Sequence, residues 1–182
     1  MMLRWLGIAL TFRWRPRLGL LDVGRLRMRV WPSDLDANLH MNNARFFSAA
    51  DLGRLDQGLR SGVWREALRC GWKPVAGDSN ARYSASLQPF ARYELQTRML
   101  GWDDKWFFSE HRFISRGRVA AVVVVRYLFL NSRGAVPTEK VLGLIGPNVA
   151  APELPAWVQQ WSRAQSLLST QLKHERSAAE AA

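Results

Sequence analysis

The stretch Asp34-Leu35-Asp36-Ala37-Asn38-Leu39-His40-Met41-Asn42-Asn43 stands immediately before a helical pattern that begins near Ala44. Side chains of an extended chain alternate between two faces. That alternation predicts a polar face with Asp34, Asp36, Asn38 and His40 and an apolar face with Leu35, Ala37, Leu39 and Met41. Two carboxylates, an amide and an imidazole at a helix start can supply a base, its orienting partners and N–H groups that favour negative charge. The alternative is a polar capping loop, because Asn and Asp are favoured at turns and helix N-termini.

The segment behind this stretch carries apolar residues at roughly helical spacing, which predicts one long helix. We expect its N-cap at Asn42 or Asn43 and its end at about Arg60. Gly53 and Gly58 each weaken a helix by about 1 kcal/mol relative to Ala. Close packing against a sheet would explain both glycines. A second, short helix is predicted over residues 62–70.

The remaining central sequence has the alternation that is typical of strands. A half-exposed strand is predicted over 25–30, mixed β structure over 74–87, and an antiparallel meander over 94–100, 106–115 and 118–130. The apolar run 119–125 indicates a strand covered on both faces, for which the long helix is the economical cover. We therefore expect a mixed α and β domain built on one helix and several consecutive strands.

The two ends differ from this core. Residues 1–23 form a basic, tryptophan-bearing arm, which either packs on the domain or lies on an anionic membrane surface. Residues 24–148 form the folded domain. Residues 149–182 form an amphipathic helix, a packing or dimer face, and a tail frayed from Ser177 onward.

The formal net charge of +11 favours partners that carry phosphates or carboxylates, including coenzyme A, an acidic carrier protein, a membrane surface or nucleic acid. Cys70 is the only cysteine, which excludes an intramolecular disulfide and is compatible with a reducing compartment. A calcium loop beginning at Asp34 fails, because Leu39 stands where Gly is needed and Arg45 where Glu is needed. His40, His111 and His174 are too dispersed for a zinc motif. We expect no metal, and without an aromatic RNA-binding signature nucleic acid is the weakest partner.

The stretch from Asp34 to Phe47 resembles the D-x-D-x-N-x-H-x-N-N-x-(R/K)-(Y/F) signature of hotdog-fold acyl thioesterases. It is similar to the 4-hydroxybenzoyl-CoA thioesterase group and to the plant acyl-carrier-protein thioesterases. Residues 39–46 and 100–105 are most similar to the branch called thioesterase superfamily member six. The resemblance covers about residues 24–143. It implies an α+β hotdog fold, in which an antiparallel β-sheet wraps a long central helix, with dimers joined edge to edge and active sites at the dimer interface.

The resemblance also implies roles for individual residues. Asp36 matches the catalytic carboxylate, and Asn38 and His40 match its partners in the plant branch. Backbone N–H groups around Asn42 and Asn43 would polarise the thioester carbonyl. We expect substrate binding by Asn42, Asn43, Asp34 and Ser79, where Ser79 stands with Asp78 and Asn80 in the stretch that supplies a further polar residue in some relatives. His111 and Glu110 are expected to be structural.

The function expected from these observations is hydrolysis of acyl-CoA or acyl-carrier-protein thioesters by a homodimer or homotetramer. Asp36 would act as general base or nucleophile. No cofactor is expected, since coenzyme A or phosphopantetheine enters as part of the substrate. The alternative is a non-catalytic acyl-binding or scaffold protein of the same fold at a membrane surface. We expect a cytoplasmic protein, with membrane association through the N-terminal arm as a variant of that expectation.

Overall fold

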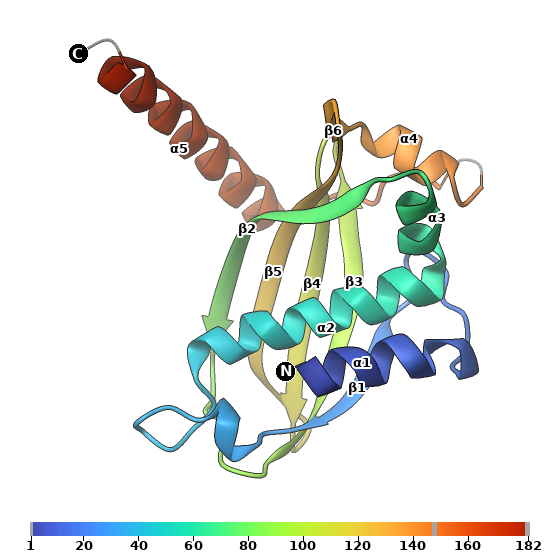
Figure 1. The fold of residues 1–182 in the computed structure, drawn as a ribbon. Coiled ribbons are helices and arrows are strands. Elements are labelled where there is room, and N and C mark those ends of the chain that lie inside the picture. Colours follow the sequence, from blue (N-terminus) through green and yellow to red (C-terminus); the bar gives the residue numbers. More distant parts are fainter. Residues whose placement is uncertain (1, 147–148, 181–182) are drawn as a thin grey trace.

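The structure, a computed structural model, describes residues 2–146 and 149–180. An antiparallel sheet curls around one long helix, α2 (Asn43–Ser61), as Figure 1 shows. The strand order across the sheet is β1, β3, β4, β5 and β2, and the short β6 pairs with β5. The strand bounds are β1 Gly24–Arg29, β2 Lys73–Tyr83, β3 Arg92–Trp102, β4 Phe107–Ser115, β5 Arg118–Asn131 and β6 Gly134–Val136. The predicted sheet around a central helix is confirmed.

Further helices surround this unit. Their bounds are α1 Met2–Thr11, α3 Val63–Arg69, α4 Thr138–Gly143 and α5 Ala156–Glu180, with 3-10 turns η1 Phe12–Trp14 and η2 Pro32–Asp34. The meander β3–β4–β5 is antiparallel throughout, as predicted. Helix α5 continues to Glu180, so the expected fraying from Ser177 is wrong for residues 177–180, and residues 181–182 lie outside the described part. Residue 148, where the predicted domain ends, also lies outside it.

Helix α2 begins and ends where its sequence has capping residues. The Asn42 side chain accepts a hydrogen bond from the Ala44 N–H at 2.8 Å, which satisfies one of the unpaired donors of the first turn. Gly62 ends the helix in the left-handed conformation, with φ of 83°. These caps confirm the predicted start at Asn42 or Asn43 and the predicted end near Arg60.

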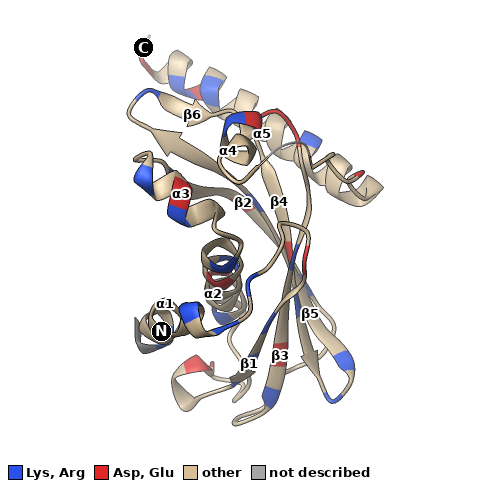
Figure 2. Cartoon of the chain, turned by 90° about the vertical axis from the view of Figure 1, so that its right-hand side faces the viewer, with Lys and Arg blue, Asp and Glu red and all other residues tan. Residues whose placement is uncertain are grey.

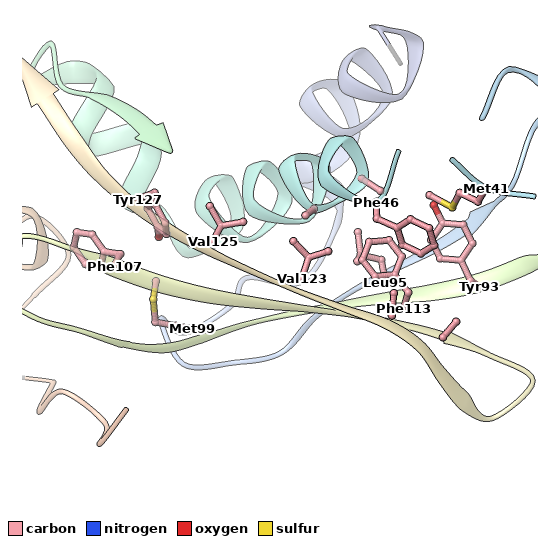
Figure 3. Close-up of a cluster of buried hydrophobic side chains, with 14 of the residues drawn as sticks. Met41, Phe46, Tyr93, Leu95, Met99, Phe107, Phe113, Val123, Val125 and Tyr127 are labelled. Carbon is pink, nitrogen blue, oxygen red and sulfur yellow. The ribbon is translucent and has the colours of Figure 1, made fainter. Parts of the chain in front are cut away.

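The main core fills the space between α2 and the inner face of the sheet. Figure 3 shows aromatic and aliphatic side chains from β3, β4 and β5 beneath the helix, with Met41 and Phe46 above them. Phe46 stacks edge-on against Phe113 at 4.9 Å between ring centroids. Burial of such side chains contributes about 1.5–3 kcal/mol each, so this layer holds the start of α2 in place.

Strand β5 is covered on both faces over most of its apolar run. Val123 and Val125 belong to the inner core, whereas Val124 packs on the outer face with Val158 of α5. Arg126 also points outward and donates hydrogen bonds to the Ser162 carbonyl and hydroxyl at 3.1 Å. The apolar run of β5 was expected to be covered on both faces. The first half of α5 covers its outer face.

The two helix glycines have different neighbours. A Cβ at Gly53 would lie 2.2 Å from Thr97 Oγ1 of β3, so α2 approaches the sheet closely there, as predicted. A Cβ at Gly58 would lie 2.4 Å from the Trp64 ring of α3. The expectation of a sheet contact at Gly58 is wrong, because helix α3 folds back against that turn of α2.

The N-terminal arm packs on the domain. Ile8 of α1 is buried against Leu52 and Leu55 of α2. Arg4 forms an ion pair with the buried Asp34 at 2.7 Å, and Arg15 forms one with the buried Asp56. Among the described residues, no helix combines the length and the apolar content that a bilayer crossing requires.

The arm also covers the free edge of β1. Arg4 donates a hydrogen bond to the Arg29 carbonyl at 3.1 Å, and Arg15 donates one to the Arg25 carbonyl at 3.0 Å. Strand β1 pairs only with β3, so its other edge would otherwise present unpaired groups. Strand β2, at the opposite end of the sheet, pairs only with β5 among the described strands, and all its side chains are exposed or half-buried. The arginine side chains of the arm thus cover the β1 edge of the sheet, whereas the β2 edge is open.

His111 is fully buried and held by two hydroxyl groups. Its Nδ1 lies 3.0 Å from Thr97 Oγ1 and its Nε2 lies 3.1 Å from Ser109 Oγ. Glu110, on the opposite face of β4, accepts hydrogen bonds from Arg98 and Arg112 at 2.7 and 2.8 Å. Both residues have the structural roles that were expected.

We expect stability to fall below pH 6.5 because of His111. Burial and the nearby Arg54 charge hold the pKa of His111 well below its usual value of 6.5. The unfolded state therefore binds a proton that the folded state does not, and stability is lost as the pH falls through 6.5. The His111 contribution reaches about 1.4 kcal/mol per pH unit. Urea denaturation at pH 7.0 and 5.5 measures the difference.

The exposed His174 of α5 provides the control for this measurement. His174→Gln should retain the full drop in unfolding free energy between the two pH values. His111→Gln should start less stable and show a smaller drop. Equal drops in both variants would show that His111 does not produce the pH dependence.

Candidate active site

The loop before α2 is a small hairpin and not an extended segment. Leu35 and Met41 form an antiparallel bridge, and the Asp36 N–H donates to the His40 carbonyl at 3.1 Å. The chain reverses between them with Leu39 in the left-handed conformation, φ of 58°. Leu39 is 66% exposed whereas Met41 is 3% exposed, so the predicted single apolar face is wrong. The reversal at residues 37–39 breaks the period of two.

Asp34 holds the entry to this loop. It is buried, its carboxylate accepts a hydrogen bond from the Trp31 N–H at 3.0 Å, and it pairs with Arg4. Its backbone carbonyl accepts from the Asn42 N–H at 2.8 Å, which fixes the distance between η2 and the start of α2. All these contacts are internal, so in this structure Asp34 holds the loop in place. The Pro32-Ser33-Asp34 sequence, with Pro opening a turn that Asp caps, is the signal for this role.

Asp36 lies at the base of the hairpin with one carboxylate oxygen engaged and one free. Oδ1 accepts a hydrogen bond from the Asn38 N–H at 2.9 Å and lies 3.5 Å from His40 Nδ1. Oδ2 has no partner within residues 2–146 and 149–180. The side chain is 23% exposed. The loop therefore orients the carboxylate and leaves one oxygen available for chemistry.

The partners of Asp36 act in different ways. His40 approaches it through the imidazole, whereas Asn38 approaches it through the backbone N–H. The Asn38 side chain is exposed and has no partner in the described part of the chain. The structure thus brings the three expected catalytic residues together in one turn.

The first turn of α2 follows directly. Asn42 uses its side-chain oxygen for the helix cap. The Asn43 N–H has no acceptor among the described residues, and the Asn43 carbonyl accepts a hydrogen bond from Tyr83 Oη at 3.4 Å. The Asn42 side chain is thus engaged in the helix cap, whereas the Asn43 N–H is a donor at the positive end of the helix dipole that has no acceptor among the described residues.

Ser79 lies away from this group within one chain. It shares the inner face of β2 with Tyr83, and four residues of strand separate them by about 13 Å. Ser79 is exposed on the open edge strand. Asp78 points to the outer face, where Arg126 Nε donates to it at 2.8 Å. Within one chain, Asp78 is therefore engaged by Arg126 on the outer face, whereas Ser79 is exposed on the inner face of β2.

Two grooves of the single chain lie elsewhere. One of about 880 Å³ lies between α1 and β1, and one of about 830 Å³ lies beside α5. Asp36 lines neither groove. In the described part of the chain, no group of three or more His, Cys, Asp or Glu side chains is placed to hold a metal ion. The reactive group that this site offers is the oriented carboxylate of Asp36, which lies shortly before the N-terminus of α2.

The curled sheet, the central helix and the position of this loop define a protein class with the hotdog fold. The chain superposes on the YbaW probable thioesterase from Escherichia coli with a TM-score of 0.61 and 16% identity, over 68% of this chain and 98% of that one. It superposes on the BH1999 gentisyl-coenzyme A thioesterase with a TM-score of 0.56 and 18% identity, over 66% and 99% of the two chains. These similarities confirm the hotdog fold.

Sequence comparison then gives the family. The sequence profile of the thioesterase-like superfamily matches residues 30–162. Protein THEM6 of Xenopus laevis is 34% identical over 148 residues, which are 80% of this chain and 70% of that protein. The chain belongs to the thioesterase-like superfamily.

Proposed function

We propose that this chain hydrolyses acyl thioesters, with Asp36 as general base or nucleophile. The observation that supports this most is the carboxylate of Asp36, which is oriented through Oδ1 and has no partner for Oδ2 among the described residues, in the hairpin that leads into the N-terminus of α2. Membership of the thioesterase-like superfamily and the name of the superposed gentisyl-coenzyme A thioesterase support the same reaction class. Coenzyme A or a phosphopantetheine carrier would be the thiol part of the substrate.

In the general-base route, Oδ2 removes a proton from water as the water oxygen attacks the carbonyl carbon. Negative charge then develops on the carbonyl oxygen, where the Asn43 N–H and the α2 dipole stabilise it. When the C–O double bond re-forms, the C–S bond breaks and the thiolate leaves. Thiolates are stable enough at neutral pH that the step needs no strong general acid. The thiolate then takes up a proton from solvent, and the Asp36 carboxyl releases the proton it had gained, which restores the carboxylate.

In the nucleophilic route, Oδ2 attacks the same carbon and forms a mixed anhydride as the thiolate departs. Water then hydrolyses the anhydride and restores the carboxylate. His40, 3.5 Å from Oδ1, would hold the carboxylate in its orientation in either route. We assign the Asn38 side chain to the substrate or the attacking water, because it is exposed next to Asp36 and has no partner in the described part of the chain.

We infer that a second copy of the chain completes the site by pairing along β2. The β1 edge is blocked by Arg4 and Arg15, whereas the β2 edge offers unpaired backbone groups over Lys73–Tyr83. Two-fold pairing of open edges is a common route to dimers. It would bring Ser79, on the inner face of β2, to the dimer interface together with the end of the strand that contacts Asn43.

Charging the open edge should separate the dimer. Ala76 and Ala81 of β2 are exposed or half-buried, and lysines there would repel across a two-fold axis. We expect Ala76→Lys/Ala81→Lys to sediment as a monomer and to lose thiol release in proportion to the dimer lost. Analytical ultracentrifugation measures the mass. Ala135→Lys, on the exposed part of β6, is the matched control and should stay dimeric. A double variant that remains dimeric and active would contradict pairing along β2.

The proposed function is tested by free thiol release from a panel of acyl-CoA and acyl-carrier-protein thioesters. Turnover of any of these above the spontaneous rate supports hydrolysis, and the chain lengths accepted give the substrate class. Tight binding of acyl-CoA without thiol release from any thioester would instead support the non-catalytic acyl-binding alternative.

A further inference from the structure

Helix α1 presents an apolar face to solvent. With 3.6 residues per turn, Leu6 and Leu10 lie opposite Ile8, the residue that is buried against α2. Leu6 is 51% and Leu10 is 67% exposed, and Trp5 is 38% exposed. The only charged residue of α1, Arg4, pairs inward with Asp34. An ordinary surface helix places polar residues toward solvent. The apolar outer side of α1 therefore indicates that a second surface packs on it, in addition to the domain on its inner side.

The same surface continues into a strongly basic turn. Trp14 of η1 is 82% exposed, and exposed Arg13 and Arg17 flank it. Neither arginine has a carboxylate partner within the described residues. Tryptophan and arginine together are typical of the polar boundary of a bilayer, where the ring contacts acyl chains and the guanidinium contacts phosphates.

A hollow of about 310 Å³ lies where this turn meets the end of α2. Its charged lining consists of Arg13, Arg15, Arg17, Arg60 and Arg65. Arg15 and Arg60 together hold the single carboxylate of Asp56, and Arg65 holds Glu66. The five guanidinium groups therefore exceed the carboxylates that neutralise them, which leaves the pocket cationic. Figure 2 shows the Lys and Arg positions of this region in blue on the ribbon around α1 and the facing end of α2.

We propose that α1 and η1 form a docking surface for an anionic lipid bilayer. Leu6, Leu10 and Trp14 enter the boundary between headgroups and acyl chains, and Arg13 and Arg17 contact the lipid phosphates. A bilayer fits better than a protein partner, because it supplies apolar surface and negative charge side by side along the whole of α1. The side of α1 that faces the domain stays as it is, so docking needs no unfolding of the arm.

Sedimentation with lipid vesicles tests the apolar part of this surface. The full chain should bind vesicles of phosphatidylcholine mixed with phosphatidylserine more strongly than vesicles of phosphatidylcholine alone. Leu6→Gln/Leu10→Gln should lower the partition coefficient by about tenfold, since two inserted side chains become polar. Leu167→Gln/Leu172→Gln on α5 is the matched control, because those leucines are 73% and 51% exposed, and it should bind like the native chain.

The charged part is tested with arginine variants. Arg13→Gln/Arg17→Gln should weaken binding to the phosphatidylserine vesicles and reduce its salt dependence, with little change on phosphatidylcholine alone. Arg118→Gln/Arg133→Gln, on exposed arginines of β5 and the turn that follows it, should leave binding unchanged. Circular dichroism melting curves identify any variant that is not folded. Asp36→Asn should bind vesicles normally, since docking is independent of hydrolysis.

Three results would overturn the proposal. The native chain could fail to sediment with anionic vesicles at low salt. The α1 and α5 leucine pairs could reduce binding equally, which would indicate non-specific adhesion. The α1 pair could alter the mass of the protein in solution without affecting vesicle binding, which would show that another protein chain covers this face.

Discussion

Asp36→Asn is expected to lower thiol release by about 10²–10⁴-fold, the range that a positioned acid or base contributes. Asparagine keeps the shape of the side chain and an oxygen that can accept from the Asn38 N–H. It cannot take up a proton from water or form an anhydride. The free energy of unfolding should change little, because the side chain lies in a partly exposed hairpin.

Asp104→Asn is the matched control for this substitution. Asp104 is exposed in a turn; its backbone carbonyl accepts a hydrogen bond from the Thr138 N–H, and its side chain has no hydrogen-bond partner among the described residues. We expect native rates and native stability for this variant. Equal residual rates for Asp36→Asn and the native protein would exclude Asp36 from the chemistry and leave the fold assignment intact.

Gly53→Ala is expected to have the largest effect on stability. An added methyl group would lie 2.2 Å from Thr97 Oγ1 and 3.2 Å from His111 Nδ1, both in the buried polar cluster. The gain of about 1 kcal/mol in helix propensity cannot offset the displacement of α2 from the sheet. We expect a net loss of about 1–3 kcal/mol in the free energy of unfolding, measured by urea denaturation.

Gly7→Ala makes the same chemical change in α1, where the added methyl group would meet nothing within 4 Å. That variant should be unchanged or more stable by up to about 1 kcal/mol. A Gly53→Ala protein as stable as Gly7→Ala would mean that α2 does not approach β3 as closely as described.

Much of the fold could be predicted because its signals are local. The Asn42 cap, the alternation along β3 and the apolar run of β5 each lie within a few residues of sequence. Stabilising pairs that join distant segments could not be predicted in this way. Arg4 and Asp34 are 30 residues apart, and Arg15 and Asp56 are 41 apart. No spacing rule relates residues at such separations. The covering of the β1 edge by Arg4 and Arg15 therefore could not be predicted from the sequence.

The residues of the candidate site could be predicted from the sequence, but the conformation of the loop that carries them could not. The motif brought Asp36, Asn38 and His40 to attention, but an extended chain was the wrong geometry for them. Leu39 takes a left-handed conformation that leucine rarely adopts, so its identity gave no sign of the turn. The role of Asp34 was separable from that of Asp36 only once its burial and its pairing with Arg4 were known.

The most direct test of the central claim is a crystal structure of the Asp36→Asn variant with a bound acyl-CoA. The account predicts that the thioester carbonyl lies beside the residue 36 side chain, with its oxygen about 3 Å from the Asn43 N–H. It also predicts that the acyl chain lies at the interface of two copies paired along β2. An acyl group bound instead in the groove between α1 and β1, or in the groove beside α5, would contradict it.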